Sequence, residues 1–196
     1  IVSYYGFDPL KTIYLILLIT LIGTMYTIYQ LPQSLILLFL KTIVGMKYKL
    51  EVNGITNIPQ TGGVLLLGNH ISWIDWAVVL MAVPKEVRFV MDKTIYSKWY
   101  IKWIFRMFNA IPISNASSKT TIKIIAKQLD EGNIVVIFPE GSITRNGHLG
   151  EFKKGFEKIL ELTNTDVKVV PFYIRGLWES MFSRANQKFK KSNRTN

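Results

Sequence analysis

Residues 64–75 read VLLLGNHISWID, and this stretch decides the fold class. Its first five residues form a continuous apolar run, which is typical of a strand covered on both faces of a parallel sheet. Similar runs recur at 134–138 and 167–174, and helical patterns lie between them. Strands that alternate with helices predict an α/β domain with a largely parallel central sheet flanked by helices.

The remaining elements follow from local periodicity and from turn residues. We expect strands at 48–52, 64–68, 87–91, 110–113, 134–138 and 167–174. We expect helices at 73–83, 94–108, 117–129 and 153–162. Ligands of open α/β sheets bind beyond the carboxyl ends of the strands, so polar residues at those ends are the candidates for a site.

Composition excludes several classes of protein. The chain has 196 residues, 49% of them hydrophobic, and a net charge of +11. Such a chain can bury a core, which a disordered polypeptide cannot. With no cysteine and two histidines, it offers neither a disulfide scaffold nor a Cys nucleophile, and we expect no metal site and no bound cofactor. Its cationic and apolar surface suits anionic lipid or an acidic carrier protein, and no nucleic-acid-binding motif is present.

The N-terminal region predicts two apolar helices. Residues 12–29 carry no charge, and as a helix they would extend about 27 Å, close to the thickness of the hydrocarbon core of a bilayer. This helix either spans a membrane, lies flat on one or is buried in protein. Residues 34–46 are too few to span and suit a membrane interface or a core. We therefore expect a membrane-associated segment at 1–47, a globular domain at 48–180 and a basic tail at 181–196.

The first chemical motif follows the strand at 64–68. His70 stands at the carboxyl end of that strand, and Asp75 follows in the first turn of the next helix. There the carboxylate can accept a hydrogen bond from one imidazole nitrogen, which fixes the tautomer and raises the basicity of the other. The pair would act as a general base toward a hydroxyl. A structural histidine beside a helix-capping aspartate is the alternative.

The second motif, Phe138-Pro139-Glu140-Gly141, ends the strand at 134–138. A parallel sheet carries Glu140 to the same edge as His70, where it could bind substrate hydroxyls. Gly141 allows close approach of a ligand, and Arg145 could bind phosphate. A turn with a solvated carboxylate is the alternative.

These residues resemble the glycerolipid acyltransferase family, of the lysophosphatidic acid acyltransferase type. His70 to Asp75 matches its H-x-x-x-x-D block, and residues 138–141 match F-P-E-G. Two weaker blocks match at 110–113 and 169–172, in the family order, over residues 48–174. The resemblance implies transfer of a fatty acyl group from a thioester to a lysophospholipid hydroxyl, with His70 as base and Asp75 orienting it. Expected substrate-binding residues are Asn69, Ser72, Glu140, Gly141, Ser142 and Arg145.

Two departures from the family pattern bear on the acceptor. Ser114 and Asn115 stand where an arginine is usual, and Ser142-Ile143-Thr144-Arg145 replaces the frequent Thr-Arg-Ser. Fewer cations favour a phosphodiester acceptor such as lysophosphatidylethanolamine, with lysophosphatidic acid as the alternative. A catalytically silent lipid-binding module of a transporter fusion is the alternative from another class.

The pattern is similar to the acyltransferase part of bacterial 2-acylglycerophosphoethanolamine acyltransferases. That part is sometimes fused to a lysophospholipid transporter and an acyl-carrier-protein synthetase. This resemblance implies acyl carrier protein or coenzyme A as the donor's carrier. It also implies an inner-membrane enzyme with its site on the cytoplasmic face, and we expect this chain to be a fragment of such a fusion.

One predicted helix face carries both cations and aromatic residues. Lys98, Lys102 and Arg106 recur every four residues, and Trp99 and Trp103 lie among them. This pattern suits a membrane interface, an acidic carrier protein or a solvated face above a core helix.

Overall fold

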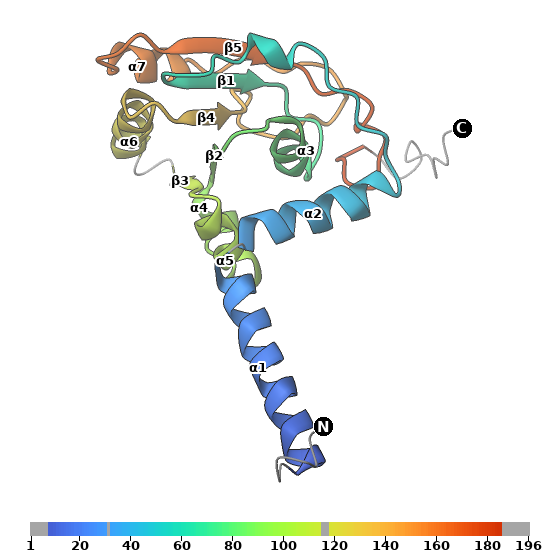
Figure 1. The fold of residues 1–196 in the computed structure, drawn as a ribbon. Helices are drawn as coiled ribbons and strands as arrows, with labels where there is room; N and C mark the ends of the chain where they lie inside the picture. The colour runs from blue at the N-terminus through green and yellow to red at the C-terminus, as the bar shows by residue number, and fades with distance from the viewer. Residues whose placement is uncertain (1–7, 31, 115–117, 186–196) are drawn as a thin grey trace. The chain divides into compact units, whose positions relative to one another are not determined.

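The computed structural model describes residues 8–30, 32–114 and 118–185 (Figure 1). Two compact units divide the chain between Phe39 and Leu40. The helices are α1 (Pro9–Gln30), α2 (Pro32–Gly45), α3 (Asp75–Ala82), α4 (Lys93–Tyr96), α5 (Trp99–Met107), α6 (Ser118–Asp130) and α7 (Gly155–Glu161). The strands are β1 (Val64–Gly68), β2 (Val87–Asp92), β3 (Ile111–Ile113), β4 (Ile134–Ile137) and β5 (Lys168–Phe172).

A five-stranded sheet forms the centre of the second unit, in the order β3-β2-β4-β1-β5. Every pairing is parallel, as the continuous apolar runs predict. Parallel neighbours need long crossover connections, and helices supply them. The predicted α/β fold with a parallel central sheet is therefore confirmed.

Alternate residues of β1 separate the two faces of the sheet. Leu65 and Leu67 contribute to a core cluster with Ile125 and Leu129 of α6 and Ile159 of α7. The intervening β1 residues are also buried, so both faces are covered, and Figure 1 shows α3 well apart from α6 and α7. Burial on both faces explains why β1 lacks the alternation of apolar and polar residues that marks a half-exposed strand.

Two predicted elements are wrong in detail. Residues 48–52 alternate like a strand but form none, because they pair with no neighbouring strand and their side chains are mostly exposed. The helix predicted at 94–108 is broken into α4 and α5. The break falls at Ser97 and Lys98, where Lys98 adopts an extended backbone (ψ 121°) as the N-cap of α5.

Helix α1 contains a candidate membrane span. Pro9–Thr27 is long and apolar enough to cross a bilayer, and none of it is buried in the protein. The hydroxyls of Thr20, Thr24 and Thr27 are satisfied within the helix, since each donates a 2.8 Å hydrogen bond to the carbonyl four residues earlier. Internal pairing of polar groups is what a lipid environment requires.

Candidate active site

Neighbouring strands deliver the two predicted motifs to one edge of the sheet. β1 and β4 are paired in parallel, with Leu67 opposite Ile137, so their carboxyl ends lie side by side. His70 follows β1 by two residues, and Glu140 follows β4 by three. The topology therefore brings together residues that are 70 positions apart in the sequence.

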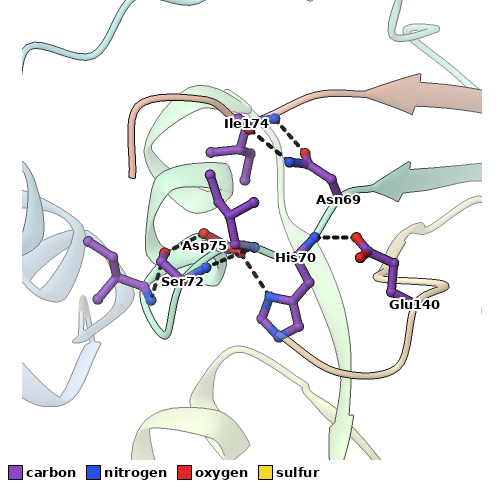
Figure 2. A network of polar contacts seen from close by, with 8 residues as sticks. Asn69, His70, Ser72, Asp75, Glu140 and Ile174 are labelled. Carbon is purple, nitrogen blue, oxygen red and sulfur yellow. Dashed lines mark hydrogen bonds and ion pairs between the residues drawn. The ribbon is translucent and has the colours of Figure 1, made fainter. Parts of the chain in front are cut away.

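Asp75 is the organising residue of this edge (Figure 2). Its carboxylate is fully buried, at the first position of α3. One oxygen, Oδ2, lies 2.8 Å from His70 Nδ1 and accepts hydrogen bonds from the backbone N–H groups of Ile71 (2.7 Å) and Ser72 (3.0 Å). The other oxygen accepts the Ser72 hydroxyl. Four donors thus surround one carboxylate, and α3 begins with a negative group at the positive end of its dipole.

The His70 ring is held on two sides. Because the carboxylate is an acceptor, Nδ1 carries the proton in the neutral imidazole, which places the lone pair on Nε2. Figure 2 shows the second ring nitrogen pointing away from Asp75. Phe138 stacks on the imidazole, with ring centroids 4.4 Å apart and planes 15° apart. The His70 side chain remains 24% exposed, so Nε2 belongs to a partly accessible, oriented base.

The main chain of His70 is also fixed, by the loop after β4. Its N–H donates to Glu140 Oε1 (2.8 Å), and its carbonyl accepts from the Thr144 N–H (2.8 Å). Glu140 Oε2 accepts from the Gly150 N–H (2.8 Å). Glu140 is 7% exposed, and both of its oxygens bind backbone. In this structure Glu140 therefore positions the loop and His70, and since it also lines the hollow described below, its predicted contact with substrate stays a prediction.

Asn69 and Ser72 likewise have internal partners. The Asn69 carboxamide donates to the Ile174 carbonyl (2.8 Å) and accepts from the Ile174 N–H (2.7 Å). This pair continues the contact between β1 and β5 beyond the last strand residue. Ser72 is fully buried against Asp75. The geometry thus gives both residues a positioning role.

Two of the other three predicted residues line a hollow of about 650 Å³ formed mainly by residues 140–153. Ser142 and Arg145 line it, together with Lys153 and Arg184. Gly141 has a positive φ of 68°, and a side chain there would meet the Lys153 ammonium group at 2.5 Å. Arg184 lies over the Trp73 ring (5.0 Å). Within the described residues none of these three cations forms an ion pair, although Glu140 and Glu151 also line the hollow. The hollow therefore offers positive charge beside the strand end that holds His70.

Four positions escaped the sequence analysis. Gly150 supplies a donor to Glu140, and a side chain at Gly150 would meet that carboxylate at 2.7 Å. Phe172 lies beneath Phe138 (6.1 Å, edge on) and fills the space that Gly68 leaves free. Arg184 reaches the hollow because Ser183 bridges to Ser72. Phe138 and Phe172 did carry a sequence signal, since they lie in the family blocks at 138–141 and 169–172. Among the described residues, no group of three or more His, Asp or Glu side chains could hold a metal ion.

Comparison of the sequence with models of known protein families identifies the domain that contains this site. The acyltransferase family model matches residues 49–175, which include both motifs and all five strands. The chain belongs to the acyltransferase family. Its oriented histidine and the loop at Glu140 therefore lie within the family's domain.

Relatives within this family are mostly named for one reaction. The chain is 27% identical over 138 residues to the chloroplastic 1-acyl-sn-glycerol-3-phosphate acyltransferase LPAT1 of Arabidopsis thaliana, covering 68% of this chain and 38% of the relative. It is 22% identical to the 1-acyl-sn-glycerol-3-phosphate acyltransferase of Bacillus subtilis, covering 76% of this chain and 75% of the relative. The chain thus spans well under half of the chloroplast relative.

A solved structure shares the fold. The crystal structure of the 1-acyl-sn-glycerophosphate acyltransferase PlsC from Thermotoga maritima matches with a TM-score of 0.58 and 20% identity. The match covers 88% of this chain and 79% of that one. The likeness establishes the acyltransferase fold for the observed sheet and helices.

Proposed function

We propose that this protein transfers a fatty acyl group from an acyl thioester to the free hydroxyl of a lysophospholipid. The observation that carries the proposal is the His70–Asp75 pair, buried on the Asp75 side and open at Nε2. Family membership supports the reaction class. The same pair in a merely structural role would need no accessible second nitrogen.

The proposed step is a direct displacement. Nε2 of His70 accepts the proton of the acceptor hydroxyl as its oxygen attacks the thioester carbonyl. The carbon–sulfur bond then breaks, and the thiolate leaves with the proton that His70 returns. Asp75 holds the tautomer and stabilises the imidazolium formed in between. A positioned base of this kind contributes about 10²–10⁴-fold.

Lysophosphatidic acid is the acceptor that we propose first. Most of the relatives are named 1-acyl-sn-glycerol-3-phosphate acyltransferases, which favours the alternative in the sequence analysis over lysophosphatidylethanolamine. The cations around the hollow support the same choice. Arg145, Lys153 and Arg184 line it, so positive charge is available although Ser114 and Asn115 replace the usual arginine.

A membrane is the proposed location of the reaction. Both substrates carry acyl chains, and α1 is apolar enough to span a bilayer. Attachment through the segment at 1–47, with the site on the cytoplasmic face of a bacterial inner membrane, remains part of this proposal. Acyl carrier protein and coenzyme A are both candidate carriers of the donor. The expected fusion to a transporter and a synthetase also remains part of this proposal.

The test is a matrix of donors and acceptors. The chain in phospholipid vesicles is given a labelled acyl group on carrier protein or coenzyme A, with lysophosphatidic acid or lysophosphatidylethanolamine as acceptor. We expect labelled diacyl product, formed faster with lysophosphatidic acid. Preference for the ethanolamine acceptor would reverse the choice of acceptor but leave the reaction standing.

His70→Ala separates catalysis from binding. We expect it to lose transfer by at least 10²-fold while its far-UV circular dichroism and vesicle binding stay those of the wild type. The matched control is Lys123→Ala on the exposed face of α6, which does not line the hollow. Transfer by the His70 variant at the wild-type rate would refute the mechanism. Vesicle and lysolipid binding by the wild type with no product from any donor would indicate a lipid-binding module.

A further inference from the structure

The outward face of α5 exposes several aromatic side chains. Trp99 is 86% exposed, Trp103 54% and Tyr100 51%. Cations stand among them at Lys98, Lys102 and Arg106, and residues 93–107 contain no acidic residue. A soluble surface seldom gathers this much exposed aromatic area on one short helix.

The inward face of α5 is firmly packed, which separates the two roles of the helix. Phe105 is 7% exposed and contacts the Trp76 ring edge on (5.9 Å) and the Tyr96 ring (6.4 Å, stacked). Trp76 directly follows Asp75 in α3. The core therefore needs Phe105, whereas Trp99 contacts, among the rings of the described residues, the exposed Tyr100.

Topology places this face on the catalytic side of the domain. β2 runs parallel to β4, so its carboxyl end lies at the same edge as the strand ends that carry His70 and Glu140. α4 starts at that end, with Asp92 as its N-cap, and α5 follows after two residues. Whatever binds α5 is consequently held near the edge where the proposed reaction occurs.

We propose that the outer face of α5 docks on an anionic lipid bilayer and holds the catalytic edge against it. Trp and Tyr prefer the membrane–water interface, and cations beside them attract anionic headgroups. An acidic carrier protein would use the cations but would not require three exposed aromatic rings. This inference goes beyond the proposed reaction, because docking can be measured without any turnover.

A single label tests the contact locally, since the chain contains no cysteine. Trp99→Cys in the full chain is labelled with a nitroxide and mixed with vesicles of phosphatidylcholine, with or without phosphatidylglycerol. With phosphatidylglycerol present we expect the label to become accessible to oxygen and protected from a water-soluble nickel chelate. The matched control is Lys123→Cys on the exposed face of α6, where the label should remain exposed to water.

Charge variants test the role of the cations. Lys98→Gln/Lys102→Gln/Arg106→Gln should weaken docking of the Trp99→Cys label about 100-fold, at about fivefold for each cation. The control removes the same charge from α6 with Lys119→Gln/Lys123→Gln/Lys127→Gln, which are also spaced by four residues, and should change docking much less. Membrane attachment through α1 is common to every variant, so the difference reports α5.

Three results would overturn the proposal. The first is a label at position 99 that remains as exposed to water as the one at position 123. The second is an equal loss of docking in the two triple variants, which would mean that net charge alone acts. The third is immobilisation of the label only when an acidic acyl carrier protein is added, which would assign the face to that protein. None of these readouts depends on whether acyl transfer occurs.

Discussion

Replacement of Asp75 by asparagine removes a charge while leaving the hydrogen bonds almost intact. Oδ2 accepts three donors, of which two are the backbone N–H groups of Ile71 and Ser72. An asparagine must place its amide oxygen there, because an NH₂ group would face those donors. Its NH₂ group then meets the Ser72 hydroxyl, which can accept as well as donate. We therefore expect Asp75→Asn to fold and to keep the His70 tautomer.

The lost charge sets the size of the effect on rate. An imidazolium and a carboxylate about 4 Å apart attract each other by about 4 kcal/mol at an effective dielectric constant of 20. Asp75 is fully buried, so water screens this attraction little. If the transition state contains an imidazolium, loss of this attraction slows transfer by about 10³-fold. The assay is the initial rate of labelled acyl transfer in vesicles, with a thermal melt of the same preparation.

Two comparisons make this prediction decisive. Asp75→Ala leaves the donors to Oδ2 unpaired in the interior, at about 1–3 kcal/mol each, and should lower the melting temperature strongly. Glu161→Gln removes an equal charge from the exposed end of α7 and should change neither rate nor fold. If Asp75→Asn melts normally and transfers within tenfold of the wild type, His70 does not become an imidazolium in the rate-limiting step.

Three further substitutions test the positioning network. Glu140→Gln turns one of its two acceptor oxygens into a donor that faces a backbone N–H. We expect a loss of about 2 kcal/mol in stability and a lower kcat. A raised KM for the acceptor with unchanged kcat would instead indicate that Glu140 contacts the substrate. Gly68→Ala places a methyl group 2.1 Å from the Phe172 ring; denaturant unfolding should show a loss of about 1–3 kcal/mol, and unchanged stability would contradict the packing. Asp92→Ala removes the cap of α4 and about 1 kcal/mol at pH 7. The Thr94 hydroxyl and N–H hold the pKa of Asp92 below its usual 3.8, so this stabilisation is complete above that value and fades as pH falls through the lowered pKa; a wild-type-minus-variant difference that grows on acidification would reverse the sign.

Local patterns predicted most of the sheet. β1 was predicted at the residues where it occurs, since an apolar run that ends in Gly-Asn has few other readings. The strand at 48–52 failed because pairing depends on a neighbour that local alternation cannot reveal. The break before Trp99 was not predicted, because the residues around it favour a helix. We attribute the start of the new helix to the packing of Phe105 against Trp76, which local sequence does not reveal.

The contacts of the site were likewise predicted only in part. Contact between His70 and Asp75 was predicted because both residues lie on one short turn. Glu140 was predicted at the correct edge of the sheet, but its two backbone partners were not predicted. Its carboxylate binds two backbone N–H groups, and the order of side chains in the sequence does not indicate such backbone contacts. Arg184 was assigned to a tail because its approach to the hollow depends on the bridge between Ser183 and Ser72.

The grip on residue 70 through its peptide N–H and C=O has a practical consequence. Glu140 and Thr144 bind atoms that every amino acid possesses, so the surrounding loop does not register which side chain that position carries. A side chain that cannot accept a proton at position 70 would therefore leave the rest of the site in place. Such a variant could hold donor and acceptor together without turnover, which would make it suitable for crystallising the complex.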